Sequence, residues 1–281
     1  MRTTVLLCAA LASCGRVAFD PLNDGGMDAR VCTGPFGAPM LIMSLNSNMT
    51  EATFRLTADE LTGVFWSART GNIDLYLATR KALDRPFTVA PITSVNDVAS
   101  EFGPALAPDG SVLVFSSNRT GGTGGLDLYE SAFVGNEFAA PTRITSLATA
   151  GVEDQAYLVG SEMYFMSGRS GIPELYHAAR SGPASYGVAV ELTELSSGAG
   201  ENDPVLSPDA LRIYWQSKRS NGGDVYTATR TSTAEPFGSI TEVAELTTSS
   251  VDAPSFLSTD GCRLYMSSDR AGMPQIYMTS R

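Results

Sequence analysis

The feature that most constrains this chain of 281 residues is a unit of about 50 residues that recurs five times. The units align on one arginine each, at intervals of 50, 50, 50 and 51 residues: Arg69, Arg119, Arg169, Arg219 and Arg270. Every unit opens on an acidic residue and then has a short apolar segment, a turn, a second apolar segment and a loop. A fixed period of this kind indicates a repeat architecture in which each unit packs against its neighbours.

Each unit predicts four short β-strands. Between the first two segments lie turn residues, and two of these turns, Asp109-Gly110 and Asp260-Gly261, are typical hairpin signals because glycine adopts positive φ. A third segment begins with motifs such as Asp-Leu-Tyr, and a fourth runs from an aromatic residue to a leucine. No stretch shows helical periodicity. Four short strands in about 50 residues are typical of one blade of a β-propeller.

One strand is out of order, and its position predicts how the ring closes. The first three strands occur five times, but the fourth follows only the first four units. The missing copy lies near the N-terminus, in residues 36–45, with the sequence FGAPMLIMSL. Pairing of this strand with the last unit would remove the open sheet edges. We therefore expect an all-β domain over residues 34–281, a five-bladed β-propeller of four-stranded antiparallel blades, closed by an N-terminal strand (36–45) that completes the C-terminal blade.

Residues 1–13 predict a bacterial lipoprotein signal peptide. Arg2 precedes an apolar run from Val5 to Ala12 that is too short to span a bilayer as a helix. The ending Leu-Ala-Ser-Cys resembles a lipobox, which makes Cys14 the lipidation site; a secretory signal cleaved elsewhere is the alternative. Gly15 after this cysteine favours the outer membrane. Residues 14–33 lack periodicity and are expected to be a tether, so the protein would be exported and lipid-anchored, facing the periplasm or the surface.

Two cysteines remain after signal cleavage and lipidation, and they are candidates for a disulfide bond in an oxidising compartment. Cys262 directly follows the Asp260-Gly261 turn, and Cys32 precedes the closing strand of the same blade. Both should therefore emerge on one face of the last blade. The net charge of −11 and the absence of a basic run exclude nucleic acid as an expected partner.

The five opening acids form a candidate channel-mouth binding ring: Glu51, Glu101, Glu153, Glu201 and Asp252. As the first residues of the innermost strands, they should surround one mouth of the central channel. Carboxylate oxygens there suit calcium or magnesium, or a basic segment of a partner. The alternative is that each acid pairs with the arginine that ends the neighbouring strand, which yields a self-neutralised structural ring. We favour that pairing, and we expect no cofactor and no resident metal.

The sequence shows no catalytic constellation. His177 is the single histidine and lies inside a predicted strand. The sequence has no G-x-S-x-G nucleophile elbow whose serine this histidine could activate. The glycine-rich segment 119–125 is followed by a predicted strand rather than a helix, so it is not expected to hold a phosphate.

The units PALAPDGSVLVFSSNR and PVLSPDALRIYWQSKR resemble the WD-like β-propeller repeat of the TolB family, and the resemblance covers residues 50–281. It implies a periplasmic protein that binds other proteins, including peptidoglycan-associated lipoproteins, although the chain has no room for the additional N-terminal domain of TolB. Together these observations predict a monomeric, non-catalytic binding scaffold for a protein or peptidoglycan-associated partner at the cell envelope. The alternative is a carbohydrate-active enzyme, a glycosidase or polysaccharide lyase, which would need two unpaired channel carboxylates.

Overall fold

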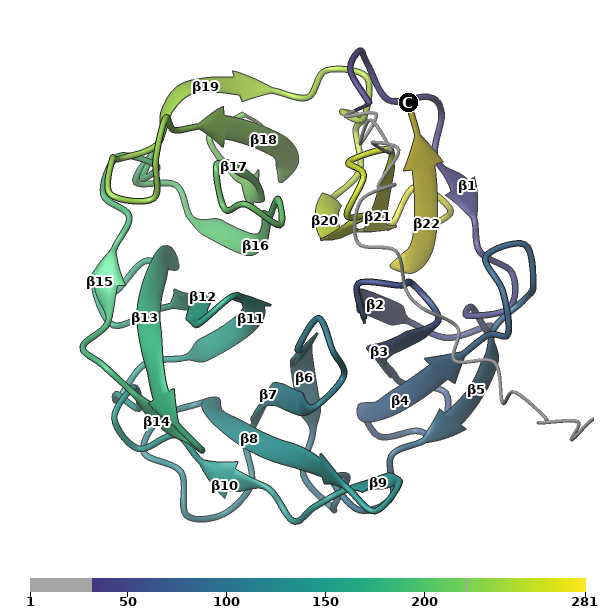
Figure 1. Cartoon of the computed structure of the whole chain (residues 1–281), viewed down its shortest axis with the longest axis vertical. Helices are drawn as coiled ribbons and strands as arrows, with labels where there is room; N and C mark the ends of the chain where they lie inside the picture. Colours follow the sequence, from purple (N-terminus) through teal and green to yellow (C-terminus); the bar gives the residue numbers. More distant parts are fainter. Residues whose placement is uncertain (1–31, 221) are drawn as a thin grey trace, which may run out of the picture. The chain divides into compact units, whose positions relative to one another are not determined.

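The computed structural model describes residues 32–220 and 222–281, and these form β-strands without a helix. Five antiparallel sheets follow one another around a central axis in chain order, so the described chain is a five-bladed β-propeller (Figure 1). The predicted signal peptide (1–13), Cys14 and most of the predicted tether lie outside the described residues.

Each blade is a meander whose first strand is innermost. Blade 1 consists of β2 (Glu51–Leu56), β3 (Thr62–Ser67), β4 (Asp74–Thr79) and β5 (Thr88–Pro91). Blade 2 consists of β6 (Glu101–Leu106), β7 (Val112–Ser117), β8 (Asp127–Val134) and β10 (Thr142–Arg143), with β9 (Glu137–Phe138) also paired to β8. Blade 3 consists of β11 (Glu153–Val159), β12 (Glu162–Ser167) and β13 (Glu174–Gly182), with both β14 (Ser185–Tyr186) and β15 (Val190–Glu191) on β13. Blade 4 consists of β16 (Glu201–Leu206), β17 (Arg212–Ser217), β18 (Asp224–Thr229) and β19 (Gly238–Glu242). Blade 5 consists of β20 (Asp252–Leu257), β21 (Arg263–Ser268), β22 (Gln275–Ser280) and the N-terminal β1 (Met40–Leu41).

The N-terminal strand closes the ring, as the sequence predicted. β1 pairs antiparallel with β22 on the outer edge of blade 5, with Leu41 opposite Tyr277 (Figure 1). The regular strand is shorter than the predicted range 36–45, but backbone hydrogen bonds extend the pairing from Gly37 N to Ser280 O (2.8 Å) and from Ile42 N to Ile276 O (3.1 Å).

The predicted disulfide between Cys32 and Cys262 is present in the structure, with the two Cα atoms 5.0 Å apart. It links the residue just before the closing segment to the β20–β21 turn of the blade that this segment completes. A second contact reinforces the junction, since the guanidinium of Arg281 lies 4.5 Å from the centre of the Phe36 ring. Both ends of the described chain are thus attached to blade 5.

The innermost strands are not regular, and their irregularity shapes the channel. All five have a register shift near the third residue of the strand. In three of them that residue has a non-glycine side chain at positive φ: Thr53 (54°), Gln155 (54°) and Asp203 (51°). β-bulges of this kind bend a strand and redirect its side chains. Here they carry polar residues from blades 1, 3 and 4 to the centre of the ring.

The hydrophobic core lies between the blades, where the faces of successive sheets meet. Its largest fully buried apolar side chains include Phe54, Phe65, Phe115, Phe165 and Trp215, all from the first two strands of a blade. The tyrosine that recurs in every third strand is also buried, as expected for sheet packing.

Candidate functional site

The five opening acids are the first residues of the innermost strands, as predicted, but none of them is exposed at the mouth. All five are completely buried, and each forms an ion pair with the arginine of its own blade. The N–O distances are 3.4 Å for Glu51–Arg69, 2.9 Å for Glu101–Arg119, 3.8 Å for Glu153–Arg169, 3.4 Å for Glu201–Arg219 and 2.7 Å for Asp252–Arg270. The structure therefore has the paired arrangement that the sequence analysis favoured over an open binding ring.

The Glu101–Arg119 pair of blade 2 illustrates the structural role of these ion pairs. Arg119 donates from Nη2 to Glu101 (2.9 Å) and to the carbonyl oxygen of Val95 (2.9 Å), and from Nε to Ser117 Oγ (3.1 Å). Its guanidinium also lies 4.9 Å from the centre of the Tyr129 ring. Arg119 thus connects β6 and β8 of blade 2 to Val95, which follows the last strand of blade 1. The ion pair is therefore a structural cross-link between neighbouring blades.

A different polar cluster lies deeper in the channel and involves Arg55 of β2. This side chain is 1% exposed. Its Nη1 donates to the carbonyl oxygen of Ser255 in blade 5, and its guanidinium lies 5.0 Å from the ring centre of Tyr157 in blade 3, which places it on the axis. Its Nε and Nη2 have no hydrogen-bond partner among the described residues. Burial lowers the pKa of Arg55 to about 10.

Two aspartates on the bulged strands interact electrostatically with this arginine. Asp154 accepts hydrogen bonds from Ser116 Oγ and from the backbone N–H of Gln155. Asp203 is 7% exposed and has no hydrogen bond to a described residue. Burial raises the pKa of Asp203 to about 7; the positive charge of Arg55 opposes this rise and the negative charge of Asp154 adds to it. Asp203 is therefore a carboxyl that changes its charge near neutral pH.

Asp203 lines a small channel pocket with a volume of about 170 Å³. Residues of blades 1, 3, 4 and 5 contribute to the lining, so the pocket lies on the ring axis. Its other polar lining residues are Thr53, Trp66, Gln155, Gln216, Ser267, Ser268 and Asp269. The Asp269 carboxylate accepts from the backbone N–H of Val251 (2.8 Å). Thr53 Oγ1 donates to Gln155 Oε1 (3.2 Å) across the ring. Ligand pockets for drug-sized molecules are usually about 300–1,000 Å³, so this one suits a single polar side chain or peptide group.

Sequence reasoning missed Arg55, Asp154 and Asp203. The repeat directs attention to positions that recur in all units, whereas each of these residues is a deviation in one unit. Arg55 stands where the other units have Ala105, Tyr157, Val205 and Phe256. A charged residue inside an otherwise apolar innermost strand was the available signal.

The remaining sequence candidates have structural roles in the part of the chain that the structure describes. The backbone N–H groups of Thr123 and Gly124 point at the carboxylate of Asp127, so the glycine-rich loop binds the protein's own anion (Thr123 N to Asp127 Oδ2, 2.8 Å). His177 Nδ1 lies 3.1 Å from Glu162 Oε2. Across residues 32–220 and 222–281, no group of three or more His, Cys, Asp and Glu residues is arranged to hold a metal ion. No helix in these residues is long and apolar enough to cross a membrane.

The described geometry defines the class of protein: a five-bladed β-propeller with a polar, partly unsatisfied channel. No protein-family model and no curated protein sequence matches the chain. Similar solved structures include TolB from Acinetobacter baumannii, with a TM-score of 0.54 and 19% identity, covering 85% of this chain and 56% of that one. They also include a thermostable family-43 glycoside hydrolase (TM-score 0.56, 7% identity, 86% of this chain and 91% of that one). A third is the α-L-arabinofuranosidase PaAbf62A from Podospora anserina in complex with cellotriose (TM-score 0.51, 9% identity, 88% and 95%).

The chain thus spans little more than half the length of the A. baumannii TolB structure. At these identities the similarity shows a shared fold, and this fold occurs both in TolB and in glycosidases.

Proposed function

We propose that this protein is a lipid-anchored, non-catalytic binding scaffold of the bacterial cell envelope, and that the channel pocket receives a polar group of a protein or peptidoglycan-associated partner. The observation that carries this proposal is the state of the pocket. Thr53, Gln155 and Asp203 line it in a backbone conformation that costs about 1–3 kcal/mol per residue, and Asp203 has no hydrogen bond to a described residue. Arg55 does not line the pocket, but its positive charge acts on Asp203, and its Nε and Nη2 have no partner among the described residues. Strained backbone and unsatisfied buried polar groups concentrate at functional sites.

The chemistry of the pocket favours a donor group on the partner. Asp203 and the side-chain carbonyl oxygens of Gln155 and Gln216 are acceptors, and above a pH of about 7 the aspartate carries a negative charge. The whole chain has a net charge of −11, which attracts a basic segment over a longer distance. The resemblance of the repeats to those of TolB-type propellers also supports a protein partner.

The paired acids support binding rather than hydrolysis. A glycosidase needs two available carboxyls, about 5 Å apart for retention or about 6.5–9.5 Å apart for inversion. All five opening acids are buried against arginines, and Asp154 is held by Ser116 and Gln155. The channel pocket, at about 170 Å³, is also smaller than usual for a site that binds a sugar substrate, which again favours binding over hydrolysis.

The second candidate function is a carbohydrate-active enzyme. It is favoured by Asp154 and Asp203, two channel carboxyls whose pKa values are both raised by burial, and by the fold shared with two glycosidases. Hydrolysis of arabinan, xylan or peptidoglycan that disappears in the Asp203→Asn variant would establish this function and contradict the scaffold proposal.

The scaffold proposal is tested by affinity capture from envelope extracts with the full-length protein, tagged at its C-terminus and extracted in detergent. We expect the wild type to capture a defined partner and Asp203→Asn to lose it. Asp109→Asn is the matched control, because it makes the same change at an exposed turn. Equal capture by the wild type and Asp203→Asn would contradict the proposed role of the pocket.

A further inference from the structure

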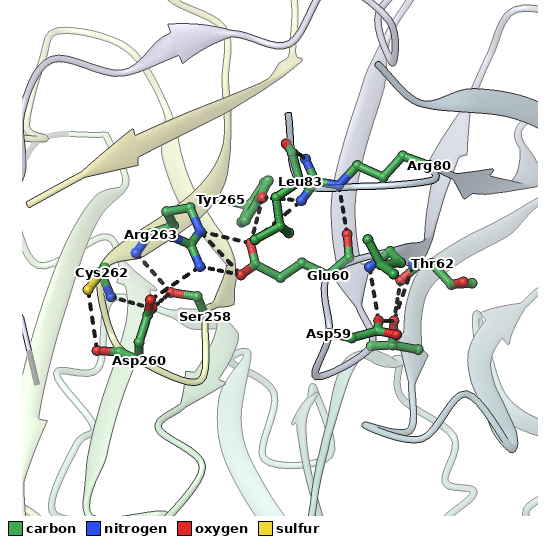
Figure 2. A network of polar contacts seen from close by, with 12 residues as sticks. Asp59, Glu60, Thr62, Arg80, Leu83, Ser258, Asp260, Cys262, Arg263 and Tyr265 are labelled. Atoms are coloured by element: carbon green, nitrogen blue, oxygen red, sulfur yellow. Dashed lines mark hydrogen bonds and ion pairs between the residues drawn. The ribbon is translucent and has the colours of Figure 1, made fainter. Parts of the chain in front are cut away.

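The junction between blades 5 and 1 is filled by an internal carboxylate. Glu60, in the β2–β3 turn, is 2% exposed and reaches across to blade 5 (Figure 2). Its carboxylate accepts from Arg263 Nη2 (2.6 Å) and from the hydroxyl of Tyr265 (2.8 Å), and it lies 3.8 Å from Arg80 Nη2. Arg80 in turn donates from Nε to the backbone oxygen of Glu60 (2.8 Å) and from Nη2 to the Tyr265 hydroxyl (3.2 Å). A tyrosine and two arginines thus hold one carboxylate, and Arg263 makes the shortest contact.

The junction between blades 3 and 4 repeats the tyrosine and one of the two arginines of this arrangement, without the carboxylate. Arg230 donates from Nε to the backbone oxygen of Ala210 (2.9 Å) and from Nη2 to the hydroxyl of Tyr164 (3.0 Å). Ala210 occupies the position of Glu60 in the repeat, with almost the same φ (57° against 58°). The tyrosine and the arginine are therefore in place, but no side chain reaches them from the turn.

An open pocket of about 690 Å³ lies at this second junction, and Tyr164, Arg230 and Ala210 all line it. We call it the blade 3–4 pocket. Tyr164 is 2% exposed, and its hydroxyl accepts from Arg230 but donates to no described residue. In the filled junction the equivalent hydroxyl of Tyr265 donates to Glu60. The hydroxyl of Tyr164 therefore lacks the oxygen acceptor that its counterpart has.

The rim of the blade 3–4 pocket is negatively charged, whereas the junction between blades 5 and 1 has an arginine, Arg263, at the equivalent strand position. Glu162 replaces Arg263 at the equivalent strand position and is paired with His177, while Glu191, Glu194, Asp209 and Glu235 also line the pocket. These five carboxylates face a single arginine and one histidine, so the rim attracts a cation. The pocket thus combines two donors for an oxygen anion with a surplus of acceptors for an ammonium group.

We propose that the blade 3–4 pocket binds a small zwitterion of the size of an amino acid. Its carboxylate takes the place that Glu60 occupies in the other junction, against Tyr164 and Arg230. Its ammonium group pairs with the acidic rim, where Glu162 replaces the arginine. The volume of the pocket is within the usual range for small-molecule sites, about 300–1,000 Å³. This site lies at the β11–β12 and β16–β17 turns, away from the channel pocket, and does not depend on the function proposed there.

The test uses isothermal titration calorimetry of the full-length protein with three probes. L-Lysine has both charged groups, cadaverine has only ammonium groups, and glutarate has only carboxylates. We expect saturable binding of lysine, with cadaverine and glutarate each at least about tenfold weaker, since loss of a hydrogen bond to a charged group costs about that factor or more.

Ala210→Glu is the decisive variant, because Glu60 shows that a glutamate fits this turn and reaches the tyrosine. It should fill the site with an internal carboxylate and weaken lysine binding at least about tenfold, while cooperative thermal unfolding is retained. Tyr164→Phe removes the donor but keeps the packing, and should also weaken lysine; it serves as the test if Ala210→Glu does not fold. Absence of saturable lysine binding, equal affinity for cadaverine or glutarate, or full lysine affinity in a folded variant would each overturn the proposal.

Discussion

Replacing Asp203 with asparagine is expected to stabilise the propeller at neutral pH while leaving its stability near pH 4 almost unchanged. The carboxyl of Asp203 is 7% exposed and has no hydrogen bond to a described residue. Burial is the main reason that its pKa rises from 3.8 to about 7, against the attraction of Arg55 and with the repulsion of Asp154. Asparagine has the same shape and cannot ionise.

The sign and size follow from proton linkage. Between pH 4 and 7 the native state binds more protons at this site than the unfolded state, so the free energy of unfolding of the wild type falls as pH rises through this window. A rise in pKa from 3.8 to about 7 corresponds to about 4 kcal/mol. The advantage of Asp203→Asn should therefore be near zero at pH 4, grow as pH rises, and level off at about 4 kcal/mol above pH 7.

Urea unfolding of both proteins at pH 4, 5.5 and 8 measures this difference. Asp109→Asn is the control with the opposite sign. The hydrogen bond from Ser111 lowers the pKa of Asp109, so that carboxylate contributes stability above its unfolded pKa, and the contribution is lost as pH falls. A difference between Asp203→Asn and the wild type that stays constant from pH 4 to pH 8 would refute the assignment of a buried, titrating carboxyl.

Three further predictions concern the lipid anchor, the Cys32–Cys262 disulfide bond and the buried acid–arginine pairs. Cys14→Ser should move the protein out of the membrane fraction or leave an uncleaved precursor; fractionation with unchanged membrane retention would contradict lipidation. Replacing Cys32 and Cys262 with serine should lower the free energy of unfolding by about 2–5 kcal/mol, and non-reducing peptide mapping should recover the two cysteines as one linked pair in the wild type. Arg119→Ala should destabilise the fold by about 3–5 kcal/mol because it leaves Glu101 buried without its partner, and adding Glu101→Gln should recover part of that loss in chemical denaturation.

The sequence by itself determined the architecture, because a repeat contains the same physical information several times. Five arginines at a constant interval give the number of blades, and an aromatic-to-leucine strand without a unit of its own identifies the closure. The disulfide followed from the same reasoning, since Cys32 and Cys262 lie next to two segments that had to meet in one blade. The sequence also indicated that the five acids sit at the starts of the innermost strands, and it favoured their pairing with the arginines without deciding it.

Only the tertiary structure decided that pairing and revealed both candidate pockets. Arg55, Asp154 and Asp203 come from three different blades, and each is a single departure from the repeat, so no local pattern connects them. They meet because the ring brings its innermost strands to one axis and because bulges redirect their side chains. The blade 3–4 pocket likewise depends on contacts across a junction: Ala210 is unremarkable as a turn residue until its counterpart Glu60 is seen bound to the preceding blade. Interactions between blades are set by the closure of the ring, a long-range constraint that the sequence of one unit does not contain.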